Sequence, residues 1–403
     1  MRPPLNSLVA LGLILVISAG YFCTQNQVYV ADGKGWDGVT YHKMYLHYKG
    51  VPSEALYDAP FNKRIGLPWL AAQLPMDATL AFRGINLLSG LAACLFLYFA
   101  LRSRVRSGVV AACLLPMVFF IYSPIRFPNF YPFTVDPPAM MLCALATLLF
   151  SRRYFVAAGV ALVASAFFRE PGIYFALALG LALAFNDRRH RPAAALICII
   201  ALAGAVATTL LKLPGGEYSQ LLTVVSNLKH KMLHPLGLLK STVCILMTLA
   251  PFLICKARTM RDVHEDNDEI HTLGRWFLLL CLAMAFLGGS DTTRIFFIGY
   301  PLFVLMLAGW VSRTDALTIV LSSLAGLFAN RFCQTIPQPI GTWPKHDVSG
   351  LFAITPDYAH PGVVAAFAAY WVACWFVIAG PGRTSLDALV QRLVRGKANI
   401  ASR

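Results

Sequence analysis

The chain has 403 residues, of which 58% are hydrophobic and only 13% are charged, and its mean hydropathy is +0.63. Soluble domains carry about 25% charged residues, so this composition excludes an ordinary soluble protein. The net charge of +15 is concentrated in short segments between apolar runs. The positive-inside rule explains that distribution, and we expect a membrane protein that does not bind nucleic acid.

Apolar runs near membrane-spanning length recur along the chain and are expected to form helices. The first, at about 6–23, lacks a small-x-small cleavage site and is expected to remain as an anchor. A long polar loop, 24–78, follows it and is called loop one below. The other predicted helices are, in chain order, about 79–101, 107–123, 134–150, 154–168, 171–186, 193–213, 236–255, 276–289, 295–310, 316–332 and 362–380.

This pattern predicts an all-α polytopic membrane protein with about twelve transmembrane helices. With both termini cytoplasmic, each basic cluster falls on the inside and loop one, with its interfacial helices, lies outside. We expect one transmembrane domain, 1–381, and a basic cytoplasmic tail, 382–403. The sequence has no self-similar halves, which argues against a transporter built from repeats.

Loop one contains two aspartates that each precede a glycine, Asp32 and Asp37. A carboxylate at such a flexible position can accept a proton from an acceptor hydroxyl as a general base. The alternative is an Asx turn that caps a short interfacial helix. Asp32 is expected to be a turn residue and Asp37 the base, although the sequence leaves the choice between them open.

Lys63 and Arg64 form a pair of cations in the second half of loop one, directly before an apolar segment. Such a pair can hold a lipid-linked phosphate, because arginine donates two parallel hydrogen bonds and lysine adds a point charge. The alternative is that both side chains extend to lipid headgroups. Basic residues outside the membrane run against the usual topological bias, which favours a functional role.

Five other charged residues lie at three predicted outer helix ends. Asp136 is expected to cap the helix at 134–150. Arg169 and Glu170 are expected either to neutralise each other at a hairpin tip or to line a substrate cavity. Asp291 and Arg294 are spaced to pair on one helical face.

The order of these features resembles the GT-C superfamily, integral-membrane glycosyltransferases that use polyprenyl-phosphate sugars. The similarity consists of an anchor helix, W-D-G-x-x-Y at 36–41 and K/R-R-x-x-x-P at 63–68. The segments 134–137, 168–170 and 290–294 fit the same pattern, so the resemblance covers roughly residues 1–310.

The resemblance implies that Asp37 is the catalytic base and that Lys63, Arg64, Arg169 and Arg294 bind the donor phosphate. It implies no cofactor, and a metal site at Asp37 is unsupported because no second carboxylate has ligand spacing. Only 334–360 could replace the acceptor-binding domain that larger members carry. The candidate substrate-binding residues are Trp36, Tyr41, His42, Asp136, Glu170 and Asp291.

We therefore expect a multi-pass enzyme of a bacterial inner membrane. It would transfer a hexose or pentose from a polyprenyl-phosphate donor to an extracytoplasmic glycan, lipid or protein. Two alternatives remain. The first is a multi-helix secondary transporter or a flippase for lipid-linked sugars, and the second is a non-catalytic membrane assembly subunit.

Overall fold

The computed structural model describes most of the chain, and every regular element in the described part is a helix, as predicted. An isolated parallel bridge joins Tyr57 to Gly215. The described residues are 5–25, 27–28, 31–35, 37–51, 56–57, 59–105, 111–112, 114–115, 125–216, 219–233, 235–259, 269–287, 296, 298–302, 304, 311, 314–329 and 361–388.

The helices fall into three groups along the chain. The first comprises α1 (Leu5–Thr24), α2 (Gly38–Tyr48), η1 (Phe61–Lys63), α3 (Gly66–Ala72) and α4 (Ala78–Arg102). The second comprises α6 (Arg126–Phe130), α7 (Asp136–Ser151), α8 (Phe155–Ser165), α9 (Pro171–Asn186), η3 (Arg188–His190) and α10 (Arg191–Leu210). The third comprises α11 (Gln220–Leu233), α12 (Pro235–Thr259), α13 (Glu269–Leu287), α16 (Ala316–Phe328) and α17 (Pro361–Ile378).

Most predicted apolar helices have a counterpart, and α2 and α3 lie in loop one, where short helices were expected without defined bounds. Two helices, α6 and α11, lie where loops were predicted. The predicted helices at 107–123 and 295–310 lie largely outside the described residues. In the described part, Ala78–Arg102 and Arg188–Leu210 are long and apolar enough to cross a membrane. Seven further apolar helical stretches of 10–17 residues lie in other described helices, among them α1, α7, α13 and α17.

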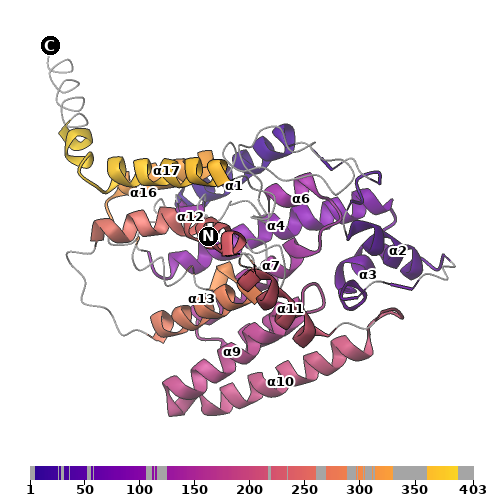
Figure 1. The fold of residues 1–403 in the computed structure, drawn as a ribbon. Coiled ribbons are helices and arrows are strands. Elements are labelled where there is room, and N and C mark those ends of the chain that lie inside the picture. The colour runs from indigo at the N-terminus through magenta and orange to yellow at the C-terminus, as the bar shows by residue number, and fades with distance from the viewer. Residues whose placement is uncertain are drawn as a thin grey trace.

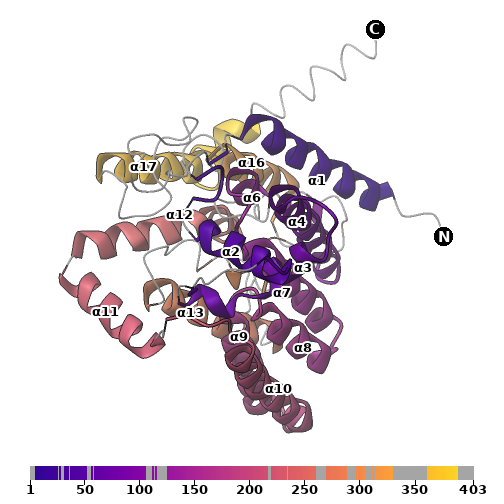
Figure 2. The same cartoon turned by 90° about the vertical axis from the view of Figure 1, so that its right-hand side faces the viewer.

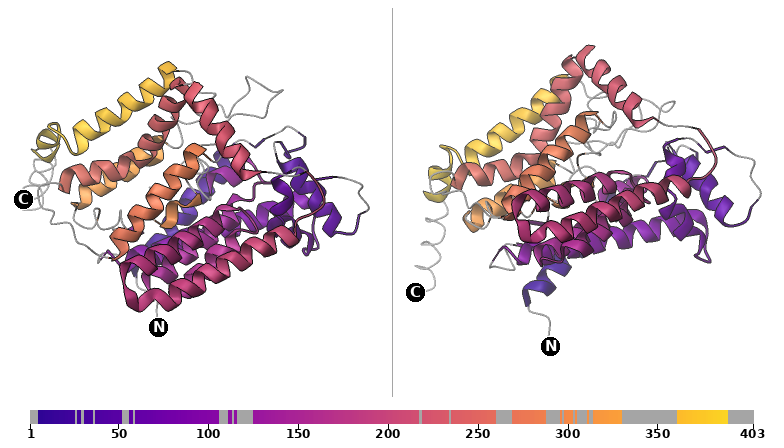
Figure 3. Two further views of the ribbon diagram at one scale, coloured as in Figure 1. Left: turned by 60° about the horizontal axis from the view of Figure 1, so that its bottom comes forward. Right: turned by 90° about the horizontal axis from the view of Figure 1, so that it is seen from below.

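The helices pack into two neighbouring groups. The larger core joins α4, α7, α8, α9 and α10, with α9 and α10 side by side in Figures 1 and 3. Small residues allow close approach there: the side chain of Val163 on α8 occupies the space beside Gly204 on α10. A second core, including Phe367 and Trp371, joins α12, α16 and α17.

The short helices of loop one gather at one end of the bundle, called the loop-one end here. Figures 1 and 2 show α2 and α3 together at this end. The backbone N–H of Gly66 donates to the carbonyl of Phe167 over 2.9 Å, and that of Val28 donates to Phe130 over 2.8 Å. These bonds fix loop one to the short helix α6 and to the turn after α8.

The opposite end, called the tail end, is held by Arg383, which follows α17. Its guanidinium donates to Asp387 (2.7 Å), to Asp315 (2.9 Å) and to the hydroxyl of Thr318 (2.9 Å). Asp315 also caps α16 by accepting from the N–H of Thr318, and lies 3.7 Å from Arg258 on α12. The contacts therefore fasten the ends of α12, α16 and α17 together.

Candidate functional site

Arg64 is the centre of a charged cluster at the loop-one end. Its Nε donates to Glu170 Oε1 over 2.9 Å, and its Nη1 donates to the Tyr41 hydroxyl over 3.0 Å. The same Nη1 lies 3.9 Å from Asp37 Oδ2. The guanidinium is buried and stacks over the ring of Phe61 at 5.1 Å. Arg64 therefore joins both halves of loop one to the α8–α9 turn.

Asp37 occupies the N-cap position of α2, but its side chain makes no capping hydrogen bond. The alternative prediction, that the Asp37 side chain caps α2, is therefore wrong. Its side chain is 16% exposed, whereas that of Asp32 is 97% exposed and lies 4.0 Å from Lys34. Gly38 allows this placement, because a Cβ there would come within 2.8 Å of the Tyr131 hydroxyl and 2.9 Å of Phe133.

A second ion pair extends the cluster: Arg169 Nε lies 2.9 Å from Asp136 Oδ1. The Thr134 hydroxyl donates to the other oxygen of Asp136 over 3.1 Å. Two sequence expectations need correction here. Val135 is the N-cap of α7 instead of Asp136, and Glu170 forms its salt bridge with Arg64 rather than with Arg169. Each of these buried charges forms its ion pair with a residue of another element, and the adjacent residues Arg169 and Glu170 therefore have different partners.

The charges around Arg64 determine several protonation states. Burial raises the pKa of Tyr41 to about 12, so its phenol is neutral near pH 7. Burial also opposes ionisation of Glu170, but the charges of Arg64 and Arg169 outweigh it and the pKa of Glu170 falls below its ordinary value. For Arg64, burial favours the neutral form, yet Glu170 and Tyr41 raise its pKa overall. The Arg64–Glu170 pair is therefore ionic.

Of the other predicted site residues, Lys63 and His42 lie within the described part of the chain and three do not. Lys63 is half-buried in η1, and its ammonium has no ion pair or hydrogen bond within the described part of the chain. His42 stacks on Tyr45 and contacts Phe133 edge-on. Burial lowers the pKa of His42, and the positive charge of Lys34 lowers it further. Trp36, Asp291 and Arg294 lie outside the described residues.

Sequence reasoning missed two further arginines near this end. Arg126 in α6 is fully buried and donates to Gln25 Oε1 over 3.1 Å. Arg83 in α4 stacks over Phe22 at 4.5 Å. Both anchor α1 and the segment after it. For Arg126 the signal was available, because a basic residue in a predicted outer loop breaks the topological bias that singled out Lys63 and Arg64. Arg83 lies inside the predicted helix 79–101, where a charge is costly and indicates a partner.

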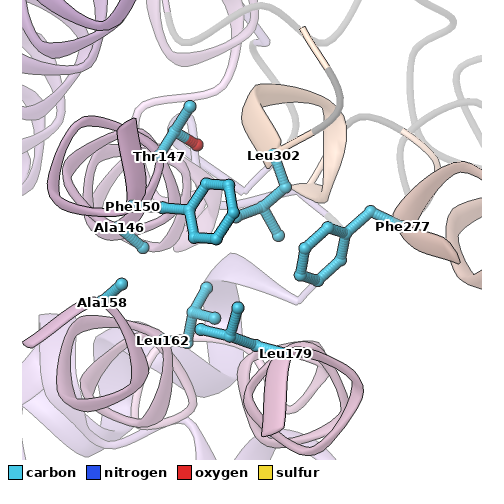
Figure 4. A pocket seen from close by; sticks show the side chains of 8 residues that line it. All are labelled: Ala146, Thr147, Phe150, Ala158, Leu162, Leu179, Phe277 and Leu302. Carbon is cyan, nitrogen blue, oxygen red and sulfur yellow. The ribbon is translucent and has the colours of Figure 1, made fainter. Parts of the chain in front are cut away.

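A small cavity lies away from this cluster, between α7, α8, α9 and α13. Figure 4 shows its walls, which are apolar except for the Thr147 hydroxyl. With a volume of about 10 Å³, it has room for roughly one water molecule. It is a packing void rather than a substrate site. In the described part of the chain, no group of three His, Cys, Asp or Glu side chains could hold a metal ion.

The arrangement brings together six of the predicted site residues: Asp37, Tyr41, Arg64, Asp136, Arg169 and Glu170. A partly exposed carboxylate beside a buried guanidinium can accept a proton from a hydroxyl at the edge of the cluster. No family model, curated protein or solved structure matches this chain.

Proposed function

We propose that the chain is a multi-pass membrane glycosyltransferase that takes its sugar from a polyprenyl phosphate. The observation that carries the proposal is the position of Asp37, whose carboxylate is turned from helix capping toward the buried Arg64. A carboxylate that served to cap α2 would accept from an N–H in the first turn of the helix, and that of Asp37 does not. The resemblance to the GT-C superfamily supports the same role for this residue.

The membrane placement has separate support. Large apolar side chains are exposed along α10, including Ile199 (62%), Leu202 (60%) and Val206 (58%). Water would oppose such a surface, whereas lipid would cover it. In the proposed topology of about twelve spans the loop-one end is extracytoplasmic and the basic tail end faces the cytoplasm of a bacterium. Helices shorter than the membrane core would tilt or distort the bilayer.

In the proposed reaction, Asp37 takes the proton of the acceptor hydroxyl as that oxygen attacks the anomeric carbon of the sugar. The bond between this carbon and the phosphate oxygen breaks, and the polyprenyl phosphate leaves with the electron pair. Lys63 is adjacent to Arg64 and is not held in an ion pair among the described residues, so it would contact the phosphate. Arg64 and Arg169, both engaged with carboxylates, would add long-range positive charge, together with Arg294.

The test compares two Asp-Gly positions in the same loop. Membranes containing Asp37→Asn are expected to transfer label from a panel of radiolabelled polyprenyl-phosphate hexoses and pentoses at least about 100-fold more slowly than wild type. Asp32→Asn is the matched control and should leave the rate within about twofold, because its carboxylate is exposed.

Lys63→Ala should raise the donor concentration that is needed for half-maximal transfer. Normal transfer by Asp37→Asn would refute the base. Uptake of the sugar into sealed vesicles without a covalent product would instead favour a transporter or flippase.

A further inference from the structure

Helix α11 exposes an unusual apolar stripe at the loop-one end. Its members are spaced four, three and four residues apart and so lie on one side of the helix. We call this set the α11 face: Leu221 (73% exposed), Val225 (54%), Leu228 (47%) and Met232 (73%). Lys229 and His230 are exposed next to it.

The opposite side of α11 already has a partner. Thr223, Val224 and Asn227 are half-buried, and the Asn227 amide donates to the carbonyl of Leu287 at the end of α13 over 3.0 Å. Helix α11 also packs against α12, and the two form a V in both views of Figure 3. The α11 face therefore points away from the protein.

Length and surroundings identify what covers the α11 face. Fourteen helical residues extend about 21 Å, too short for the roughly 30 Å hydrocarbon core. The helices that precede and follow α11 in the chain also expose large apolar side chains, Leu210 of α10 and Leu236 of α12. A short helix with an apolar face and flanking cations lies at the boundary between headgroups and acyl chains.

We propose that the α11 face binds the membrane surface at the loop-one end, with Lys229 directed to lipid phosphates. The inference rests on the membrane placement in the proposed function, but not on any enzymatic activity. The partner is the bilayer itself, because the stripe is apolar, is flanked by the cation Lys229 and follows α10 in the chain, a helix capable of crossing the membrane.

This contact reaches the charged cluster through a short strap, residues 213–216. The Tyr57 N–H donates to Pro214, and the Gly216 N–H donates back to Tyr57. Asn62 exchanges two hydrogen bonds with Leu213, one over 3.0 Å and one over 3.1 Å. Because Asn62 lies two residues before Arg64, the strap links a lipid-bound α11 to the segment that places Arg64.

Photocrosslinking tests the lipid contact without any assay of activity. The full chain, with p-benzoylphenylalanine at Leu228, is irradiated in nanodiscs of phosphatidylcholine and phosphatidylglycerol. We expect several-fold more phospholipid adduct by mass spectrometry than from the exposed control position Ser226. A probe at Ile199 on α10 reports the membrane placement: lipid adducts there with none at Leu228 would overturn only this inference. Crosslinks from Leu228 to a second copy of the chain would also overturn it.

Hydrogen exchange tests the link through the strap. Val225→Asp places a charge in the lipid-facing stripe and should release α11, so that the peptide containing 56–62 exchanges several-fold faster. Ser226→Asp is the matched control on the same helix and should leave that exchange unchanged. Equal exchange in the two variants, although Val225→Asp abolishes the lipid crosslink, would refute the coupling between α11 and loop one.

Discussion

The two ends of the bundle both hold arginines between carboxylates, but they use them differently. At the loop-one end, Arg64 joins residues far apart in sequence, and its partners Asp37 and Glu170 are only 16% and 17% exposed. At the tail end, Arg383 is just as buried, yet Asp315 and Asp387 are each 39% exposed. The carboxylates at the tail end can therefore be hydrated, whereas those around Arg64 depend on their cation.

The comparison separates the structural role of Asp315, which holds helix ends together, from the chemical role that we propose for Asp37. Asp315 accepts from a backbone N–H and a hydroxyl of Thr318 as well as from Arg383, so its lone pairs serve the helix cap. Asp37 also precedes a helix, but its backbone is helical (φ −70°, ψ −14°), whereas that of Asp315 is extended (φ −64°, ψ 149°), and the Asp37 side chain makes no capping bond. Its carboxylate lies 3.9 Å from Arg64 instead, and we propose that it takes up the acceptor proton there.

The largest expected effect comes from removing the two central arginines in turn. Arg64→Gln leaves Glu170 and Asp37 without their cation in a partly buried site, and should lower the free energy of unfolding by about 3–5 kcal/mol. Arg383→Gln should cost only about 1 kcal/mol, because its partners are more exposed. Chemical denaturation in detergent would measure both. Equal losses would show that burial does not distinguish the two ends.

The sequence predicted much of the loop-one end, because its signals are local. Asp37 before a glycine, the Lys63-Arg64 pair and the Arg169-Glu170 turn were each visible as charges at outer helix ends. Which charge pairs with which was not predictable. The partners Arg64 and Glu170 are 106 residues apart, so only the packing of loop one against the α8–α9 turn brings them together.

The helices showed the same division between local and long-range information. Long apolar runs such as 79–101 and 171–186 were predicted within a residue or so, since hydrophobicity marks them directly. The amphipathic α11 was expected to be loop, and loop one was expected to contain short helices whose bounds the sequence did not give. Polar residues interrupt the apolar pattern of α2 and α11, and α3 has only seven residues, so these helices become stable through contacts: α11 with α13, α3 with α4, and α2 with α3.

A smaller effect is expected from pH, and it belongs to the loop-one end. Because the pKa of Glu170 is lowered in the folded protein, its stabilisation is complete above about pH 4.3, the ordinary value, and is lost as the pH falls through the folded value. The stability difference between wild type and Glu170→Gln should thus be constant near pH 7. It should shrink on acidification by at most about 1.4 kcal/mol per pH unit, as followed by denaturation at each pH. A difference that grew toward low pH would mean that the carboxylate is destabilised by burial rather than stabilised by Arg64.

The smallest effect is expected at the tail end, where Asp315 combines a cap with an ion pair. Asp315→Ala removes both and should lower the free energy of unfolding by about 1 kcal/mol. Asp315→Ser keeps a capping oxygen for the Thr318 N–H, so its loss should be smaller than that of Asp315→Ala by about 0.5 kcal/mol. Thermal denaturation in detergent would resolve the two variants, and neither should change sugar transfer. If Asp315→Ser were as damaging as Asp315→Ala, the bond to Arg383 would be the main contribution, and the tail end would be held by charge in the same way as the cluster around Arg64.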